Sequence, residues 1–404
     1  MSHAMSLIED QRRYGDPLPA GELRRIRSSP AAQQPAWEGH ASFGPAVEEL
    51  AGTPGLADDR EVARFGLLVA EAAAGNLNIL QAGDCAEDPR ECTPGAVGRK
   101  AGLLDALAGV LSDRTGKPVV RVGRIGGQFA KPRSRAVERH GDLELPVFRG
   151  HLVNGPEPDP GSRAHDPGRL VECHRAARSV FEALAGRSVC DLSATWTSHE
   201  ALVLDYELPL LRRGASGRTV LSSTHWPWIG DRTRQPSGAH VRLLAAVDNP
   251  VACKVGPSMT PDELCELCGL LDPDRRPGRL TLIARQGADA VERNLPALVA
   301  AVRRAGHPVV WMCDPMHGNT VTTPAGRKTR VLEDVVREVV GFRQAVWEAS
   351  GTAGGLHLET TPDDVLECLP ADADPSVLGE RYTSLCDPRL NPEQALGVVR
   401  AWQE

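Results

Sequence analysis

Four side chains that commonly bind metal ions stand far apart along this chain. They are Cys85, His317, Glu359 and Asp387. Thiolate, imidazole and carboxylate ligands in combination suit Mn²⁺, Fe²⁺, Co²⁺ or Zn²⁺. Their wide separation excludes a zinc finger, whose ligands come in closely spaced pairs. A metal site is therefore one interpretation of these residues, and a separate structural role for each is the other.

A second set of residues is cationic. Its members are Arg124, Lys131, Arg133, Arg232, Arg234, Lys254 and Arg285. Arginine matches the oxygens of phosphate and carboxylate, and lysine adds a point charge, although a single arginine is usually a solvated surface charge. The chain has a formal net charge of −7. Convergence of these cations at one place would therefore predict a strongly anionic ligand with more than one phosphate.

Several other polar residues have two interpretations. His199 and His357 either support functional groups or are core histidines with satisfied hydrogen bonds. Asp314 either holds the backbone or transfers a proton. Cys265 and Cys268 form a Cys-x-x-Cys pair, but the pair lies in an expected amphipathic helix and has no second pair. We expect core packing for these two cysteines, and likewise for the tryptophans at 226, 228 and 311.

Eight short apolar or β-branched segments follow one another, most of them separated by helical patterns. They are 78–81, 118–122, 188–192, 219–222, 251–255, 280–284, 309–312 and 356–359. Short apolar segments bounded by glycine, proline or polar clusters are typical of buried parallel strands. The alternation of strand and helix predicts a (β/α)8 barrel, with a doubly wound open sheet as the alternative.

The polar residues named above stand at or beyond the ends of these segments. Cys85 and Arg124 follow the first two segments. Lys254 lies near the end of the fifth segment, Arg285 follows the sixth, and Glu359 is the last residue of the eighth. A barrel gathers the carboxyl ends of all its strands at one face, where active sites lie. The sequence therefore predicts that both sets of residues meet at one mouth.

The segments outside the predicted strands suggest the rest of the architecture. Thr260, Thr361 and Asn391 each precede a proline and an acidic residue, as at helix N-termini, and a short helix is expected at 6–14. Residues 1–55 are interpreted as an N-terminal arm, and 56–404 as the barrel domain with added helices. The Pro- and Gly-rich stretch 140–161 is expected to be an ordered loop beside the site.

Composition narrows the classes of function. The net charge of −7 argues against a nucleic-acid-binding surface. No apolar stretch approaches the roughly 20 residues that span a bilayer. The first residues lack a secretion-signal pattern, so a cytoplasmic location is expected and the cysteines are not expected to form disulfides.

Longer stretches of the sequence resemble class II 3-deoxy-D-arabino-heptulosonate 7-phosphate (DAHP) synthases, the plant-type enzymes that open the shikimate pathway. The matching segments are 32–37 (AQQPAW), 81–87 (QAGDCAE), 124–134 (RIGGQFAKPRS), 198–202 (SHEAL), 228–234 (WIGDRTR), 249–251 (NPV), 254–257 (KVGP), 313–320 (CDPMHGNT) and 386–391 (CDPRLN). They run almost the length of the chain in the same order, which makes the resemblance specific.

The resemblance implies an enzyme that condenses phosphoenolpyruvate with D-erythrose 4-phosphate and uses a divalent metal, Mn²⁺ or Co²⁺. The implied metal ligands are Cys85, His317, Glu359 and Asp387. The implied phosphoenolpyruvate contacts are Arg124, Lys254 and Arg285, assisted by Asp231. The implied erythrose 4-phosphate contacts are Lys131, Arg133, Ser134 and Arg232. The catalytic residues would be His317, Lys254 and Arg124, and the enzyme would be a homodimer or homotetramer.

The chain departs from the family pattern near the site. Position 231 is aspartate where the pattern has glutamate, and Arg285 is followed by Gln-Gly-Ala in place of Met-Gly-Asn. These changes leave the choice of aldose open, and an amino-sugar analogue processed in an aminoshikimate-type route is one alternative. Another is a non-catalytic barrel that assists a chorismate-using enzyme, although the sequence offers no support for a chorismate mutase partner. The family's feedback elements are missing, which implies weak inhibition by aromatic amino acids and a place in secondary metabolism.

Overall fold

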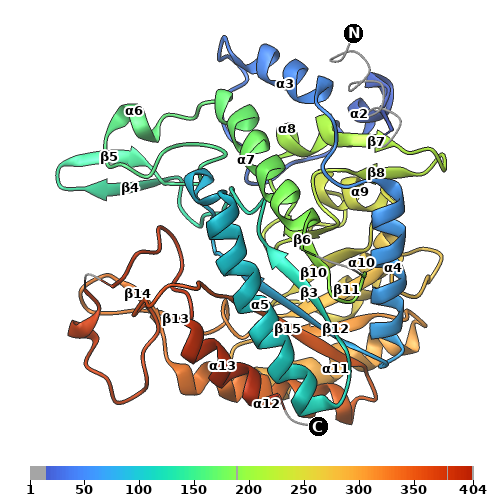
Figure 1. Cartoon of the computed structure of the whole chain (residues 1–404), viewed down its shortest axis with the longest axis vertical. Helices are drawn as coiled ribbons and strands as arrows, with labels where there is room; N and C mark the ends of the chain where they lie inside the picture. Colours follow the sequence, from blue (N-terminus) through green and yellow to red (C-terminus); the bar gives the residue numbers. More distant parts are fainter. Residues whose placement is uncertain (1–14, 188–189, 380, 403–404) are drawn as a thin grey trace.

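The computed structural model describes residues 15–187, 190–379 and 381–402. Its centre is a closed barrel of parallel strands (Figure 1). In order around the barrel, the strands are β2 (Asn78–Gly83), β3 (Val119–Arg124), β6 (Thr195–Glu200), β9 (Trp226–Ile229), β10 (Val251–Val255), β11 (Leu280–Ala284), β12 (Val310–Cys313) and β15 (Ala353–Glu359). The predicted (β/α)8 barrel is confirmed, and pairing of β15 with β2 rules out the open sheet.

Two of the predicted barrel strands are wrong. Segment 219–222 supplies β8 (Thr219–Leu221), which pairs with β7 (Leu211–Arg213) in a small antiparallel sheet outside the barrel. Segment 188–192 lies partly outside the described residues, and 190–192 are bend and turn. The true strands, β6 and β9, come a few residues later. They escape the apolar pattern because threonine, serine, histidine, glutamate and proline occupy their positions.

Helices cover the outside of the barrel. They are α5 (Pro94–Thr115), α7 (Gly168–Ala185), α9 (Ala239–Ala245), α10 (Pro261–Leu271), α11 (Val291–Arg304), α12 (Leu332–Glu348) and α13 (Pro392–Arg400). The predicted starts at Thr260 and Asn391 are confirmed. The Thr260 hydroxyl accepts the N–H of Glu263, and Asn391 forms a capping box with Gln394. Such caps satisfy N–H groups that have no partner inside the helix.

The helix predicted to begin at Thr361 is absent from the described residues. The Thr361 hydroxyl accepts the N–H of Asp363, which closes a local turn in place of a helix start. The chain then continues as a loop, with one 3₁₀ turn, η3 (Pro375–Val377), before α13. This loop places Glu367 where its carboxylate accepts backbone N–H groups at 383, 384 and 389.

Two hairpins stand at the carboxyl-terminal end of the barrel. One is β4 (Val137–His140) with β5 (Leu143–Pro146), and the other is β13 (Thr320–Thr322) with β14 (Lys328–Arg330). After β5, the stretch expected to be an ordered loop runs through turns to α6 (Pro160–Arg163). In Figure 1 both hairpins project on the left of the barrel.

The N-terminal region adds short elements above the barrel in Figure 1. They are β1 (Asp16–Pro17), α2 (Ala20–Arg27) and α3 (Phe43–Gly52), and the chain also forms α8 (Leu204–Glu207), η1 (Pro89–Glu91) and η2 (Leu208–Leu210). The helix expected at 6–14 lies outside the described residues, and the domain boundary at residue 55 stays a prediction. In the part of the chain that the structure describes, no helix has both the length and the apolar character to cross a membrane.

Helix α4 (Asp59–Ala73) closes the amino-terminal end of the barrel, on the side opposite the hairpins (Figure 1). It begins at a capping box between Asp58 and Glu61. Phe65 is fully buried and packs against Trp196 and Trp226, with ring centroids 5.2 and 5.5 Å away. Aromatic side chains therefore fill this end of the barrel, below the site.

Replacing Phe65 with alanine tests this plug. The substitution leaves a cavity among rings that cannot collapse easily, so we expect the free energy of unfolding to fall by about 3–5 kcal/mol. Leu67→Ala is the matched control, because Leu67 lies on the same helix with 70% of its surface exposed, and its effect should stay within about 0.5 kcal/mol. Urea unfolding measures both. Equal losses for the two variants would contradict the plug.

Candidate active site

A pocket opens at the carboxyl-terminal end of the barrel, between the two hairpins. Of the residues predicted from sequence, its lining holds Lys131, Arg133, Ser134, Asp231, Arg232, Lys254, Arg285, His317 and Asp387. Three more lie buried: Cys85, Arg124 and Glu359. Arg234 does not line the pocket, because its guanidinium group pairs with Asp231 and Glu263. The structure thus brings the ligand set and almost all of the cationic set to one mouth.

The carboxylate of Glu359 contacts four basic side chains in this mouth. One oxygen, Oε1, lies 3.2 Å from Arg124 Nη2, 2.9 Å from Lys131 Nζ and 3.1 Å from His317 Nε2. The other, Oε2, accepts a hydrogen bond from Arg330 Nη2 at 2.7 Å. Burial opposes ionisation, but His317, Lys131 and Arg330 hold the pKa of Glu359 well below its usual range. Glu359 is therefore a buried carboxylate that stays charged.

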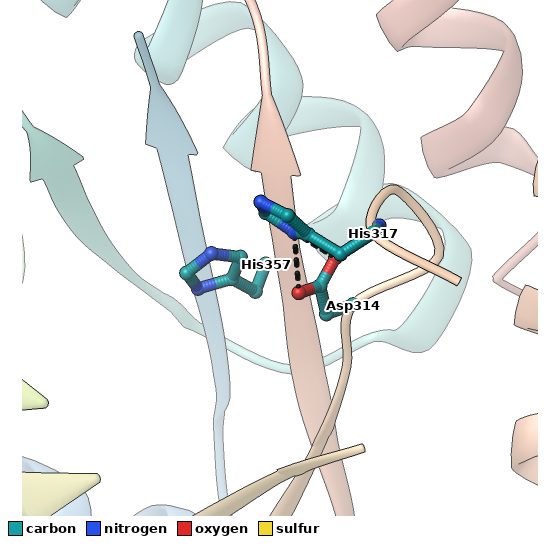
Figure 2. A group of neighbouring side chains, drawn as sticks. All are labelled: Asp314, His317 and His357. Atoms are coloured by element: carbon teal, nitrogen blue, oxygen red, sulfur yellow. Dashed lines mark hydrogen bonds and ion pairs between the residues drawn. The ribbon is translucent and has the colours of Figure 1, made fainter. Parts of the chain in front are cut away.

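His317 is oriented by a neighbouring acid. Its Nδ1 lies 2.8 Å from Asp314 Oδ2, as the dashed lines in Figure 2 show. Asp314 also pairs with Lys254, and the positive neighbours hold the pKa of its carboxyl well below the usual range despite its burial. An ionised Asp314 accepts the Nδ1 proton and so holds the His317 ring with Nε2 directed at Glu359.

Two groups of side chains have ligand atoms within 4.8 Å of one another: Asp314–His317–His357 and His317–Glu359–Asp387. In the first, both ring nitrogens of His357 are engaged. Its Nε2 accepts from Arg124 at 2.5 Å, and its Nδ1 lies 2.5 Å from the Gln81 amide oxygen. His357 therefore supports Arg124, and the second group is the better metal candidate.

Of the other two predicted ligands, Asp387 lies in the group with His317 and Glu359, whereas Cys85 does not. Asp387 pairs with Lys131 at 2.8 Å and with Lys328 at 2.7 Å. Cys85 lies outside the three-residue group, with its Sγ 3.3 Å from the hydroxyl of Ser384 on the segment that carries Asp387. A hydrogen bond with Cys386 lowers the pKa of the Cys85 thiol to about 6, and Lys131 contributes in the same direction. A thiol with this pKa is largely thiolate at neutral pH, the form that binds metals.

The cations at the inner end of the pocket surround one indole. Lys254 Nζ lies 5.0 Å from the ring centroid of Trp228, and the Arg124 guanidinium lies 5.5 Å from it. Burial lowers the pKa of Lys254 to about 8, with Arg124 acting in the same direction. Nearby, Arg285 pairs with Asp231 at 3.0 Å and donates to the His317 carbonyl oxygen. We expected Trp228 only to pack, but its ring also makes a cation–π contact with each of these two cations.

The outer end of the pocket is more exposed. Arg232 donates to the hydroxyl of Ser134 at 2.7 Å. Arg133 lies 3.6 Å from Cys386 Sγ and 3.8 Å from Glu138 on the β4–β5 hairpin. These groups lie on the rim and lack the dense pairing of the inner cations.

Sequence reasoning missed three further groups. Glu200, at the end of β6, lines the pocket, and burial raises the pKa of its carboxyl although Lys131 and Lys254 act against this. Its Oε1 has no hydrogen-bond partner among the described residues. Lys328 lines the pocket and Arg330 lies beneath it, both from the β13–β14 hairpin. Correct placement of β6 would have identified Glu200, whereas the hairpin gave no pattern that pointed to the site.

Comparison with known proteins fits this geometry. The sequence profile of the class-II DAHP synthetase family matches residues 22–193 and 185–401. A "Probable phospho-2-dehydro-3-deoxyheptonate aldolase" of Pseudomonas fluorescens is 53% identical over 386 residues, which cover 94% of this chain and 96% of that protein. The chain belongs to the class-II DAHP synthetase family.

Other relatives agree with this membership. A phospho-2-dehydro-3-deoxyheptonate aldolase of Mycolicibacterium smegmatis is 37% identical over 447 residues, with 95% of each chain covered. A solved structure of the enzyme of that name from Francisella tularensis superposes with a TM-score of 0.50 at 13% identity, covering 96% of this chain and 98% of that one. At that identity the superposition supports the fold alone.

In this member of the DAHP synthetase family, three buried glutamates hold the loops that carry the site. Each carboxylate accepts backbone N–H groups: Glu87 those of 126–128, Glu338 those of 286 and 287, and Glu367 those of 383, 384 and 389. These loops follow Arg124, follow Arg285 and flank Asp387. The carboxylates supply the acceptors that irregular buried backbone needs.

Replacing Glu367 with glutamine tests this role. The carboxylate accepts only, and Arg389 donates to both of its oxygens, so an amide nitrogen in its place leaves buried donors facing each other. We expect the free energy of unfolding to fall by about 2–4 kcal/mol. Chemical denaturation compares it with Glu393→Gln, an exposed acid on α13. A loss below about 1 kcal/mol would mean that the loop does not need the carboxylate.

Proposed function

We propose that this protein condenses phosphoenolpyruvate with D-erythrose 4-phosphate and water, giving 3-deoxy-D-arabino-heptulosonate 7-phosphate and inorganic phosphate. The observation that carries the proposal is the division of one pocket into two cationic ends beside a group of metal-ligating side chains. Two phosphorylated substrates need two such ends. The names of the close relatives and the family membership support the same reaction.

The donor set suits a divalent cation. The Glu359 and Asp387 carboxylates and the His317 imidazole place their ligand atoms within 4.8 Å of one another. The Lys131 ammonium lies within 2.9 Å of both acids, so positive charge is favourable at this point. We propose His317, Glu359 and Asp387 as ligands, with the Cys85 thiolate as the fourth, and Mn²⁺ as the ion. When bound, the ion would act as a Lewis acid towards the aldehyde oxygen of the sugar.

Phosphoenolpyruvate is proposed to bind at the inner end. Its carboxylate and phosphate together carry about three negative charges, which Arg124, Lys254 and Arg285 would balance, with Asp231 fixing Arg285. Arg124 and Lys254 each make a cation–π contact with Trp228, which restricts the positions of both cations. Fixed charges stabilise charge that develops during reaction more effectively than mobile solvent does.

The sugar phosphate is proposed to bind at the outer end, with its phosphate near Arg133, Ser134 and Arg232 and its aldehyde pointing inward. C3 of phosphoenolpyruvate then attacks the aldehyde carbon, and water adds at C2 before the C–O bond to phosphate breaks. Holding both reactants in line converts a bimolecular step into an effectively unimolecular one.

Three proton movements balance this reaction. The aldehyde oxygen gains a proton as it becomes a hydroxyl group, and the water that adds at C2 loses one. The hydroxyl group left at C2 then gives its proton to the departing phosphate as the C–O bond breaks and the ketone forms. His317 cannot hold the proton on Nε2 while that atom serves as a ligand. We therefore assign proton transfer to Glu200, because burial raises the pKa of its carboxyl and its Oε1 has no hydrogen-bond partner among the described residues.

Metal binding is testable without turnover. Calorimetric titration of Mn²⁺ into chelator-treated protein should show one site in the wild type. Glu359→Gln and Cys85→Ser should each weaken the affinity at least tenfold, because each removes a charged donor, and Cys85→Ser should leave the fold intact by circular dichroism. Glu393→Gln is the matched surface control. Full activity of chelator-treated wild type would contradict metal dependence.

Lys254→Met and Arg285→Leu test the inner end. Each removes one charge-assisted contact and keeps much of the side-chain volume, so kcat/KM for phosphoenolpyruvate should fall roughly 30- to 1,000-fold. Arg285→Leu should leave thermal stability nearly unchanged, whereas Lys254→Met should lower it, because buried Asp314 loses its ion-pair partner. Because the pKa of Lys254 is about 8, wild-type efficiency should fall as pH rises through about 8, and Lys254→Met should lack this limb. Arg304→Leu, on the outside of the barrel, is the control. Near-normal efficiency in both test variants would place the substrate elsewhere.

A further inference from the structure

The AQQPAW segment at 32–37 has no part in the chemistry proposed above, yet it crosses the mouth of the barrel. Gln33 has a φ of +62°, a left-handed conformation that residues other than glycine seldom adopt. Such strain persists only where surrounding contacts impose it. The contacts of Gln33 therefore indicate what the segment does.

Gln33 holds the backbone of the loop after β3 at two points. Its side-chain oxygen accepts the N–H of Arg133 at 2.9 Å. Its carbonyl oxygen accepts a hydrogen bond from the guanidinium group of Arg149. The carbonyl oxygen of Arg149 in turn accepts the N–H of Lys131 at 2.9 Å. Both ends of the segment Lys131–Arg133 are thus tied to one residue of the N-terminal arm.

The arm is anchored independently of that loop. The side-chain amide of Gln34 donates to the Leu202 carbonyl oxygen at 2.9 Å and accepts the N–H of Leu204 at 2.9 Å. The Pro30 carbonyl oxygen accepts the N–H of Ala239, next to the start of α9, at 2.9 Å. The segment is therefore anchored to the loop after β6 and to α9, and from there it reaches the loop after β3. Gln33 sits on a fixed frame and can impose a position on its neighbours.

We propose that Gln33 is a positioning residue for the sugar-phosphate end of the pocket, acting through the backbone of Lys131–Arg133. Lys131 contacts Glu359 and Asp387, whereas Arg133 contacts Cys386 and, on the β4–β5 hairpin, Glu138. These two side chains, separated by Pro132, keep their different partners only if the backbone that carries them is fixed. This inference rests on the proposed function, because it assigns Arg133 and Ser134 to the sugar phosphate.

The predicted effect is selective between the two substrates. Arg124, Lys254 and Arg285 lie on or next to strands β3, β10 and β11, and the described contacts of Gln33 do not reach them. Loosening the loop should therefore raise KM for erythrose 4-phosphate and leave KM for phosphoenolpyruvate unchanged. A merely structural role would instead lower stability and kcat without separating the two substrates.

Gln33→Asn and Gln33→Glu form the test pair. Asparagine tolerates the left-handed conformation but is one methylene too short to reach the Arg133 N–H. It should raise KM for erythrose 4-phosphate about three- to tenfold, as expected for one lost hydrogen bond. It should also speed hydrogen exchange at the Arg133 amide. Glutamate keeps the acceptor in reach, so in Gln33→Glu both the KM for erythrose 4-phosphate and the exchange rate at the Arg133 amide should stay within about twofold of wild type. Gln344→Asn, exposed on α12, is the matched control.

Binding of glycerol 3-phosphate separates this inference from the proposed reaction, because this probe has a phosphate and hydroxyl groups but no aldehyde. If wild type does not turn over the two substrates but Gln33→Asn still weakens calorimetric binding of the probe three- to tenfold, the reaction assignment fails and the positioning role stands. If wild type is active but Gln33→Asn changes neither KM nor probe affinity, or changes both KM values equally, the positioning role is overturned.

Discussion

The site is organised around one buried negative charge, the carboxylate of Glu359. An ion without partners costs several kcal/mol to bury, so the barrel must bring compensating groups to it. Arg124 comes from β3, Lys131 from the loop after β3, His317 from the loop after β12 and Arg330 from the β13–β14 hairpin. Segments distant in sequence are therefore fixed against a single side chain. A pocket that must attract anions thus has an acid at its base, and the surplus of cations around that acid faces the ligand.

The loops that bring these groups together have little regular structure, and a second set of acids stabilises them. Glu87, Glu338 and Glu367 play no part in the proposed chemistry. Each carboxyl group accepts hydrogen bonds from backbone N–H groups inside the protein. Burial raises the pKa of Glu338, whereas its hydrogen bonds from the backbone N–H groups of 286 and 287 act in the opposite direction. In the strands, neighbouring backbone satisfies the same groups. In the loops, a side chain has to do so, and this requirement explains buried acids away from the pocket.

The sequence allowed the barrel to be predicted, and with it most of the residues that lie at its carboxyl-terminal mouth. Buried strands are short and apolar, and the polar residues of a barrel site follow the carboxyl ends of those strands. The same rules failed where function changes the composition of a strand. In β6, Thr197, Ser198 and Glu200 are buried, so the strand lacks the apolar pattern on which detection depends. Lys328 and Arg330 could not be predicted, since only the three-dimensional path of the hairpin brings Lys328 to Asp387 and Arg330 to Glu359. The left-handed backbone of Gln33 likewise could not be predicted, because glutamine seldom adopts this conformation and the sequence around it gives no other indication.

The aromatic plug formed by α4 has a kinetic consequence. Because Phe65, Trp196 and Trp226 fill one end of the barrel, ligands enter and leave the pocket through the opposite end. Under the proposed assignment of substrates, phosphoenolpyruvate at the inner end would reach its place past the empty outer end. A pocket that is open on one side therefore favours an order of addition in which phosphoenolpyruvate binds first and the sugar phosphate second.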